Sequence, residues 1–494
     1  MNDRQGAQEP TGARPQNRRD LTGRPVESTL LLFALPTLGS SVLQSLNGSI
    51  NAIWVGRFLG EKALTATANG NILMFLLLAF VFGFGMAATI LIGHAFGRGD
   101  IALARRTLGT AVGSFFVAIV LVSALGWIFA PQLLHLLSAP PDAFALGLAY
   151  TRVVFLALPP AMMMALLMMA MRGAGDAMTP LWFMMLAVVL DGGLNPVFIL
   201  GLGPAPRLGI AGSGVATAIA NTVSLIAMIV YVYARDLPLR LDRAELAYLK
   251  PDFALLKPIF RMGVAMGLQM IVISSSALAM LGLVNRHGVL VTAAYSVTQQ
   301  LWTYVQMPAM ALGAAASAMV AQNIGAGNWT RVSRITRSAV MFNLLLTGSI
   351  VALIGFADHA ALGLFLGADS PALPVGQHIN RLATWGFVFF GVTLVLFGTI
   401  RANGAVVWPL IILFIAMYPI RLGFAITAER WLGTDALWLS FPVGSIAATT
   451  MAIAVYFHGG WKRRGLGRPQ MGAEELIERE LADSEPGGSF QPRG

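Results

Sequence analysis

Two stretches of this chain, 228 residues apart, share one pattern and decide its fold. Ile92-Gly93-His94-Ala95-Phe96-Gly97-Arg98-Gly99-Asp100 is matched by Val320-Ala321-Gln322-Asn323-Ile324-Gly325-Ala326-Gly327-Asn328. A second pair agrees: residues 171–175 are matched by residues 400–404 at an offset of 229, and in both copies a proline follows eight residues after the arginine. The chain is therefore predicted to be an internal duplication.

Each copy holds six apolar segments of the length that crosses roughly 30 Å of hydrocarbon. The prediction is an all-α polytopic membrane protein with twelve transmembrane helices in two pseudo-symmetric six-helix lobes. Because six spans separate equivalent points, the two lobes should be related by an axis along the membrane normal. The expected spans are 28–55, 64–93, 107–130, 147–171, 179–203, 210–234, 256–284, 290–321, 336–357, 378–400, 406–428 and 436–458.

Composition agrees with this class and excludes several others. Hydrophobic residues make up 56% of the chain, charged residues 11%, and the mean hydropathy is +0.71. Cysteine is absent, so there is no disulfide or thiol chemistry, and the six histidines show no metal-ligand spacing. No phosphate-binding loop and no nucleophile–base pattern is present, so we expect neither an ATP-driven pump nor an enzyme, and no cofactor or metal.

The basic residues define the expected topology. The net charge is +10, and the arginines and lysines concentrate in the tails and in the loops on the same side of the predicted bundle. The positive-inside rule places both termini in the cytoplasm, and the basic excess is a topology signal that does not indicate nucleic-acid binding. The expected segments are a disordered tail 1–27, an N-lobe 28–234, an inter-lobe linker 235–255, a C-lobe 256–458 and a second tail 459–494.

Asp191 is the clear carboxylate at bilayer depth, where a charged aspartate costs at least ~2.5–3.5 kcal/mol. Asn195 lies four residues on, about 40° around the helix, and so shares the same face. Gly192-Gly193 and Pro196 loosen the helix and free backbone carbonyls. A carboxylate, an amide and carbonyls together suit H⁺ or Na⁺. The alternative is a neutral Asp191 that donates a hydrogen bond between helices.

The first span carries a second polar set. Gln44, Asn47 and Asn51 are spaced by three and four residues, which places them on one helix face. Such amides either line a cavity or serve as hydrogen bonds between helices. Pro36 lies in the same span and is expected to kink it.

The second half differs, because its spans hold glutamines and no carboxylate at depth. At an offset of 229, Asp191 corresponds to Ile420, beside Arg421. Two interpretations of Arg421 remain open. Its side chain extends towards the outer interface, or it attracts an anionic group.

The chain resembles the multidrug and toxic compound extrusion (MATE) transporters over about 28–458, in the DinF-like prokaryotic branch. The resemblance rests on Ala34-Leu35-Pro36 with Trp54-Val55-Gly56-Arg57, the Gly97 and Gly325 loops, residues 172–176 with Thr179-Pro180, and residues 195–201. It implies two six-helix lobes and export of varied, often cationic compounds in exchange for H⁺ or Na⁺.

The chain departs from the pattern of that branch at the positions expected to carry charge. The first helix usually has an aspartate fifteen residues after its proline, where this chain has Asn51. The fifth helix usually has asparagine first and aspartate four residues later, whereas here Asp191 precedes Asn195. The resemblance therefore implies that Asp191 carries the charge, with help from Asn51 and Asn195.

These observations predict a secondary active multidrug exporter of the bacterial inner membrane, which handles small molecules and acts as a monomer. The alternative within transport is a flippase or exporter of a lipid-linked or polar metabolite precursor. A membrane-embedded enzyme and a structural or sensory membrane protein are the contrasting classes.

Overall fold

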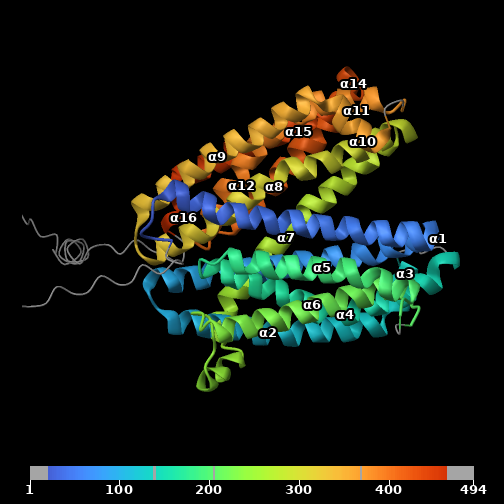
Figure 1. Cartoon of the computed structure of the whole chain (residues 1–494). Helices are drawn as coiled ribbons and strands as arrows, with labels where there is room; N and C mark the ends of the chain where they lie inside the picture. The colour runs from blue at the N-terminus through green and yellow to red at the C-terminus, as the bar shows by residue number, and fades with distance from the viewer. Residues whose placement is uncertain (1–20, 137–140, 204–205, 368–369, 464–494) are drawn as a thin grey trace, which may run out of the picture.

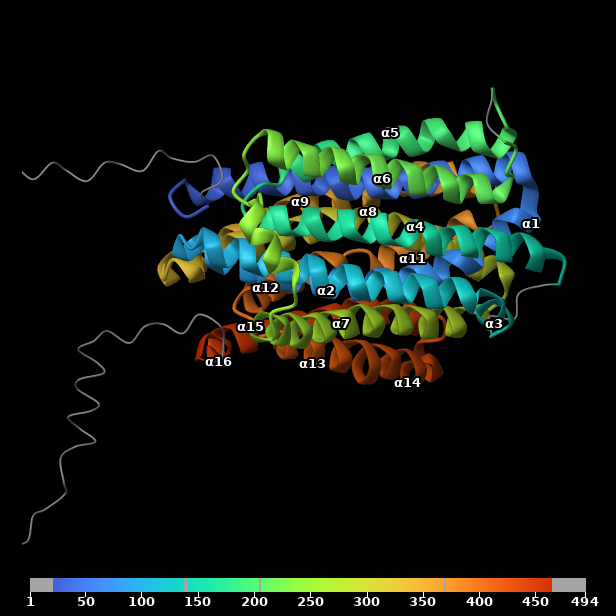
Figure 2. The ribbon, with the colours of Figure 1, turned by 90° about the horizontal axis from the view of Figure 1, so that it is seen from below.

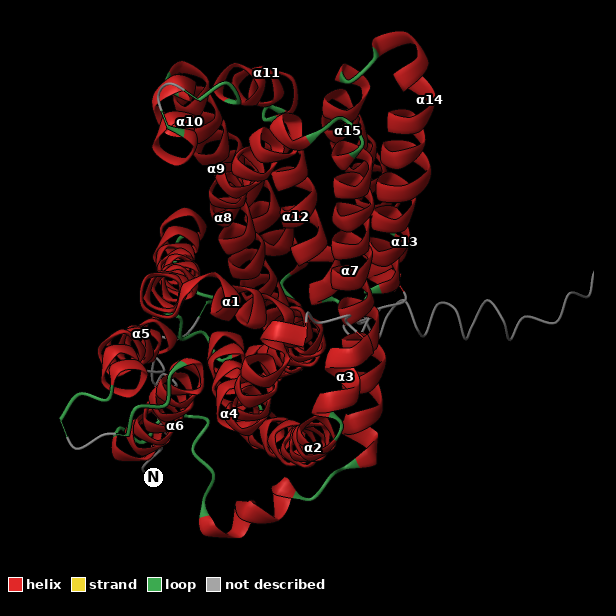
Figure 3. Cartoon of the chain, turned by 90° about the vertical axis from the view of Figure 1, so that its right-hand side faces the viewer, coloured by secondary structure: helices red, strands yellow, loops and turns green. Residues whose placement is uncertain are grey.

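The computed structural model describes residues 21–136, 141–203, 206–367 and 370–463, and helices are the only regular elements in these ranges. Figure 3 shows the helices in red, joined by loops of which the one between Ala234 and Phe253 is long. The first half contains α1 (Val26–Arg98), α2 (Ile101–Ile128), α3 (Ala130–Leu136), α4 (Pro141–Gly173), α5 (Met178–Leu200), α6 (Ile210–Ala234) and the 3₁₀ turn η1 (Arg243–Leu249). The second contains α7 (Phe253–Asn285), α8 (Val289–Gly325), α9 (Trp329–Phe356), α10 (Asp358–Leu366), α11 (Leu373–Ala383), α12 (Gly386–Ala402), α13 (Val407–Ile415), the π-helical turn η2 (Ala416–Leu422), α14 (Gly423–Leu432), α15 (Asp435–His458) and α16 (Gly460–Arg463).

The predicted number of spans agrees with the helices. In the described residues, eleven helices are long and apolar enough to cross a membrane, and the bent pair α11–α12, with an angle of 49°, makes a twelfth. This broken helix replaces the expected continuous span 378–400. Side chains that face outward are apolar, as a lipid-exposed surface requires; examples are Leu156, Phe356 and Trp431.

The first two spans differ from the prediction, because α1 continues through the expected break between 55 and 64. The sequence between them contains glycines but no proline, so nothing removes a backbone donor there. Both ends of α1 nevertheless lie beside Gln322. The backbone N–H of Leu21, just before α1, donates to Gln322 Oε1 over 3.3 Å, and Gly97 packs against the Gln322 carbonyl. The helix therefore doubles back, as Figure 2 shows.

Figure 1 shows two groups of helices: α2, α4, α5 and α6 in one, and α9, α11, α12 and α15 in the other. They converge at the end where α16 and the start of α1 lie, here called the tail end. They spread apart towards the opposite end, here called the far end, where α3, α10 and α14 lie. Both described ends of the chain thus lie at the same end of the bundle, as an even number of spans requires.

The linker between α6 and α7 is slightly shorter than the expected 235–255. Asp252 ends it, because its side chain accepts the backbone N–H of Ala254 and so caps α7 at Phe253. The expected tails lie mostly outside the described residues. Of the 1–27 segment the structure describes 21–27, and of 459–494 it describes 459–463.

The two copies of the repeat make equivalent bonds across the tail end. His94 and Gln322 correspond at an offset of 228. His94 Nε2 donates to the Ala402 carbonyl over 2.7 Å, and Gln322 Nε2 donates to the Gly173 carbonyl over 3.0 Å. The acceptors Gly173 and Ala402 correspond at an offset of 229. Each half therefore holds the other through the same contact, which is the arrangement a two-fold axis produces.

Candidate functional site

Asp191 lies in the middle of α5 and is 1% exposed. The sequence predicts a helix loosened here, but α5 runs unbroken from Met178 to Leu200 through Gly192, Gly193 and Pro196. A Cβ at Gly192 would lie 3.7 Å from Ile50 Cγ2 of α1, an ordinary van der Waals distance, and nothing lies within 4 Å of a Cβ at Gly193. The packing of α1 beside α5 therefore does not require these glycines.

Three helices supply hydrogen-bond donors to the Asp191 carboxyl group. Asn51 Nδ2, from α1, donates to Oδ2 over 3.0 Å. Thr217 Oγ1, from α6, donates to Oδ1 over 3.0 Å, and Asn195 Nδ2, one turn along α5, is 3.1 Å from the same oxygen. Asn195 Nδ2 also donates to Asn51 Oδ1 over 2.7 Å. These four side chains form one network, here called the Asp191 cluster.

The cluster has an excess of oxygen acceptors. Its donors are two amides and a hydroxyl, and no cationic side chain of the described residues pairs with Asp191. Asn195 Oδ1 is buried without a partner, and so is the Oδ1 of Asn47, whose side chain also approaches Asp191. A buried carboxylate without a counter-charge is costly, as are unpaired carbonyl oxygens. A small cation would relieve both costs, whereas a proton on Asp191 would relieve only that of the carboxylate.

The structure thus brings Asp191, Asn195, Asn51 and Asn47 together. Gln44 is exposed and makes none of the cluster's hydrogen bonds; it lies about two helical turns from Asn51 on α1. Pro36 is buried inside α1, near the tail end and away from the cluster. Thr217 was missed by the sequence analysis. A single threonine in an apolar span carries no signal of its own, because such hydroxyls commonly bond to their own helix.

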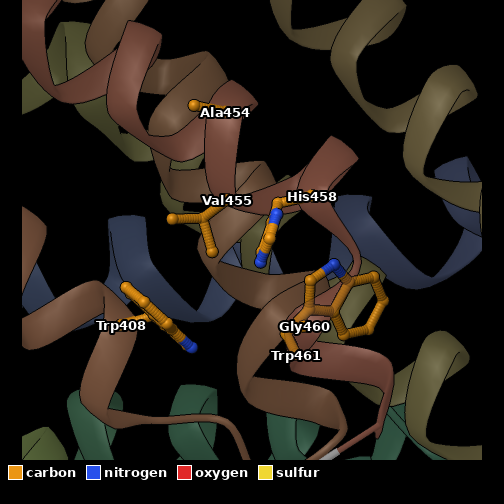
Figure 4. A pocket seen from close by; sticks show the side chains of 6 residues that line it. All are labelled: Trp408, Ala454, Val455, His458, Gly460 and Trp461. Carbon is orange, nitrogen blue, oxygen red and sulfur yellow. The ribbon is translucent and has the colours of Figure 1, made fainter.

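A separate hollow of about 390 Å³ lies at the tail end of the second half. Figure 4 shows the side chains that line it: Trp408 from α13, Ala454, Val455 and His458 from α15, and Gly460 and Trp461 from α16. Its lining contains no carboxylate. It is therefore distinct in position and chemistry from the Asp191 cluster.

Comparison with known proteins identifies the family. A family model described as MatE matches residues 36–197 and again residues 265–427, once in each half of the chain. The chain belongs to the MATE family of transporters. The starts of the two matches lie 229 residues apart, which is the offset of the internal repeat.

Curated relatives and a solved structure agree with this assignment. The chain is 33% identical over 442 residues to the probable multidrug resistance protein YoeA of Bacillus subtilis, covering 89% of this chain and 95% of the relative. It is 23% identical to a protein of Shewanella oneidensis named FAD transporter, over 90% of this chain and 96% of the relative. The crystal structure of the Vibrio cholerae MATE transporter VcmN superposes with a TM-score of 0.81 at 19% identity, covering 88% of this chain and 97% of that chain. This MATE protein is thus a multi-pass membrane protein with relatives named as multidrug resistance proteins, and its family is one of transporters rather than enzymes.

Proposed function

We propose that this MATE protein is a secondary active exporter of organic, often cationic compounds, driven by antiport with H⁺ or Na⁺, and that Asp191 carries the coupling ion. The observation that supports it is the Asp191 cluster: a carboxylate that is 1% exposed, held by neutral donors, beside two buried amide oxygens without partners. The negative charge of such a buried carboxylate is compensated only when the site holds a cation or a proton. We further propose that the protein acts as a monomer in the bacterial inner membrane, with both termini in the cytoplasm.

The coupling follows from the charge. One charge that moves through about 100 mV supplies ~2.3 kcal/mol, which supports roughly a fifty-fold gradient of a neutral substrate. The ion enters from the side where the two lobes are apart and neutralises Asp191. Rocking of one lobe against the other then changes the side from which the substrate and the ion are accessible.

The unpaired amide oxygens favour Na⁺ over H⁺ as the occupant. A proton neutralises only the carboxylate, whereas Na⁺ can also be coordinated by the Oδ1 atoms of Asn47 and Asn195. We therefore expect gradient-driven export to respond to Na⁺, and we keep H⁺ as the alternative that the same experiment decides.

The second candidate function is a flippase or an exporter of a polar metabolite. It is favoured by the Shewanella oneidensis relative, which is named FAD transporter. Both candidates use the same coupling site and differ in substrate. Competition between a cationic dye and a polar nucleotide for export by the same proteoliposomes distinguishes them.

The test is efflux of a fluorescent cation from proteoliposomes under an imposed Na⁺ or pH gradient. Asp191→Asn keeps the size of the side chain and most of its hydrogen bonding but removes its charge, so it should abolish gradient-driven export. The matched control is Asp176→Asn, at the other buried aspartate of the described α4–α5 region, which bonds to Thr179 N and Oγ1 at the start of α5. It should leave the dependence on the gradient intact. Export by Asp191→Asn at the parental rate under both gradients would overturn the proposal.

A further inference from the structure

Arg421 of the second lobe lies within one residue of the position that corresponds to Asp191 of the first lobe at an offset of 229. At the start of the family match, the two halves correspond at an offset of 229, but at its end residues 197 and 427 are 230 apart. The turn η2, Ala416–Leu422, lies between these points and is π-helical. Its i→i+5 bonds take up one more residue per turn than an α-helix does. At the offset of 230 found at the end of the match, Asp191 corresponds to Arg421 and Asn195 to Ala425, whereas at the offset of 229 they correspond to Ile420 and Phe424.

Arg421 folds back inside the second lobe. Its guanidinium carbon lies 3.7 Å from the ring centroid of Phe441 on α15, and Tyr295 of α8 packs near the same ring, with centroids 6.2 Å apart. Gly444 makes room for its stem, since a Cβ there would lie 3.0 Å from Arg421 Cβ. The side chain is partly buried. Extension towards the outer interface, one of the two interpretations of the sequence, is therefore wrong.

The charge of Arg421 lacks a counter-charge. The only hydrogen bond of its side chain within the described residues is a weak one of 3.5 Å from Nη1 to Met417 Sδ, and its buried Nε has no partner. None of the ion pairs found in the described part of the chain includes it. The aromatic face and the thioether stabilise a guanidinium but do not neutralise it. A cation in the interior of a membrane protein in this state is costly unless an anion joins it.

The chemistry of the missing partner follows from the geometry. The guanidinium carbon lies over the Phe441 ring, Nε has no acceptor among the described residues, and Nη1 has only the Met417 thioether. A planar fork of donors matches a carboxylate or phosphate, which accepts two parallel hydrogen bonds. π-helical turns inside α-helices occur frequently at functional sites, and this one sets the direction of Arg421.

We propose that Arg421 forms an oxyanion-binding site in the second lobe, which binds a carboxylate or phosphate group that is either part of the transported molecule or a free inorganic anion. The first lobe then binds the coupling cation at Asp191, and the second lobe binds an anionic group at Arg421, within one residue of the corresponding position. This deepens the proposed export function, on which the transport arm of its test rests. It extends the substrate class to zwitterionic and anionic compounds.

The experiment uses two dyes that differ in a single carboxylate: tetramethylrhodamine, which is zwitterionic, and its methyl ester, which is a cation. Binding of each to the purified full-length protein is measured by fluorescence polarisation in buffer free of phosphate and other oxyanions. Export of each is then measured in proteoliposomes under the Na⁺ and pH gradients. The variants are Arg421→Gln, Arg421→Lys and the control Arg430→Gln, which removes the same charge from the exposed face of α14.

The expected result is a selective loss. Arg421→Gln should weaken binding of the carboxylate dye about tenfold or more and leave the ester within about twofold, because a charge-assisted hydrogen bond pair is lost only with the former. Arg421→Lys keeps the positive charge but lacks the two parallel N–H donors. Its affinity for the carboxylate dye should lie between those of the parent and of Arg421→Gln. Arg430→Gln should match the parent with both dyes.

The source of the anion is decided by inorganic phosphate. If added phosphate raises export of both dyes by the parent but not by Arg421→Gln, the site binds a free anion. If phosphate instead competes with the carboxylate dye alone, the anion belongs to the substrate.

The proposal is overturned if the parent neither prefers the carboxylate dye nor responds to phosphate, or if Arg421→Gln keeps the parental ratio of the two affinities. The binding ratio needs no gradient, so it decides the Arg421 site even if neither dye is exported and the proposed function fails. If Arg421→Gln does not fold, the proposal is tested by the ratio of the two dye affinities in the parent and in Arg421→Lys.

Discussion

Gly97 and Gly325 occupy equivalent positions in the two halves, and each packs against the backbone of the other half. A Cβ at Gly97 would lie 1.9 Å from the Gln322 carbonyl oxygen, and one at Gly325 would lie 2.2 Å from the His94 carbonyl oxygen. Between them, Gly93 would bring a Cβ within 2.9 Å of Ala321 Cβ. The repeated glycines are thus explained by close approach of the two lobes at the tail end. Small residues serve this purpose at helix interfaces in membranes.

The first prediction concerns these glycines. Gly97→Ala and Gly325→Ala should each destabilise the protein by about 1–3 kcal/mol, because the added methyl group overlaps a backbone carbonyl of the other lobe that has little freedom to move. Gly348→Ala in α9 is the control, since nothing lies within 4 Å of a Cβ there. Thermal unfolding in detergent measures the effect. Equal melting temperatures for all three variants would contradict the contact.

The second prediction concerns the equivalent bonds of His94 and Gln322. His94→Gln places in the first half the side chain that the second half already uses, so it should retain the bond to the Ala402 carbonyl and cost little. His94→Ala leaves this buried carbonyl without its donor and should cost about 1–3 kcal/mol of unfolding free energy. The comparison of the two melting temperatures tests the assignment. If both variants lose the same stability, the hydrogen bond contributes nothing.

The third prediction concerns the hydroxyl of Thr217, which donates to Asp191 Oδ1. Thr217→Val removes a donor and a potential oxygen ligand 3.0 Å from Asp191 Oδ1, and should raise the half-saturating concentration of the coupling ion about tenfold. The control is Thr222→Val on the same helix, whose hydroxyl bonds to the Ala218 carbonyl of its own turn. It should leave the ion dependence unchanged. A tenfold change in both variants would indicate a general effect of α6 and not a specific contact.

The sequence predicts what depends on local pattern. The number of spans and the isolation of Asp191 follow from residues close together in the chain, and the duplication follows from the match between two such short stretches. The meeting of Asn51 with Asp191 joins residues 140 positions apart, so it was expected from the family resemblance and not from local pattern, whereas Thr217 was missed because apolar spans look alike whichever neighbours they take. The π-helical turn was also missed, and with it the packing of Arg421 inside the second lobe. One extra residue in an apolar helix leaves the hydropathy pattern unchanged, so only the backbone reveals it.

The fourth prediction concerns topology. The parent has no cysteine, so single cysteines can be labelled without removal of native ones. Ala244→Cys lies exposed in η1 at the tail end, and Val289→Cys lies exposed at the start of α8. With a membrane-impermeant maleimide on intact cells, we expect labelling at 289 and none at 244 until the membrane is permeabilised. The reverse pattern would place the basic loops outside the cell.

The fifth prediction concerns the linker, which lies flat on α2. Gly109 and Gly113 let it approach, since a Cβ at Gly113 would lie 1.9 Å from the Leu249 carbonyl oxygen. The backbone N–H of Asp242 donates to Glu245 and, together with Arg105, lowers the pKa of Glu245 below its usual value of 4.5. A carboxyl group with a lowered pKa stabilises the folded state above its unfolded pKa, and this contribution is lost as the pH falls through the folded pKa.

The linker should therefore loosen in acid, below about pH 4.5, where Glu245 becomes protonated. Hydrogen exchange of the backbone amides in 243–249, corrected for the intrinsic rate at each pH, should show protection at pH 7 that declines towards pH 4. Arg105→Ala should lose protection at pH 7, because it removes the Nη1–Glu245 contact of 3.1 Å and the bond from Nε to the Pro238 carbonyl. Arg106→Ala is the matched control. Its partner is Asp252 at the start of α7, so it should leave η1 protected. Protection that is independent of pH in the parent would show that packing of Tyr248 and Leu249 on α2 holds the linker without the help of charge.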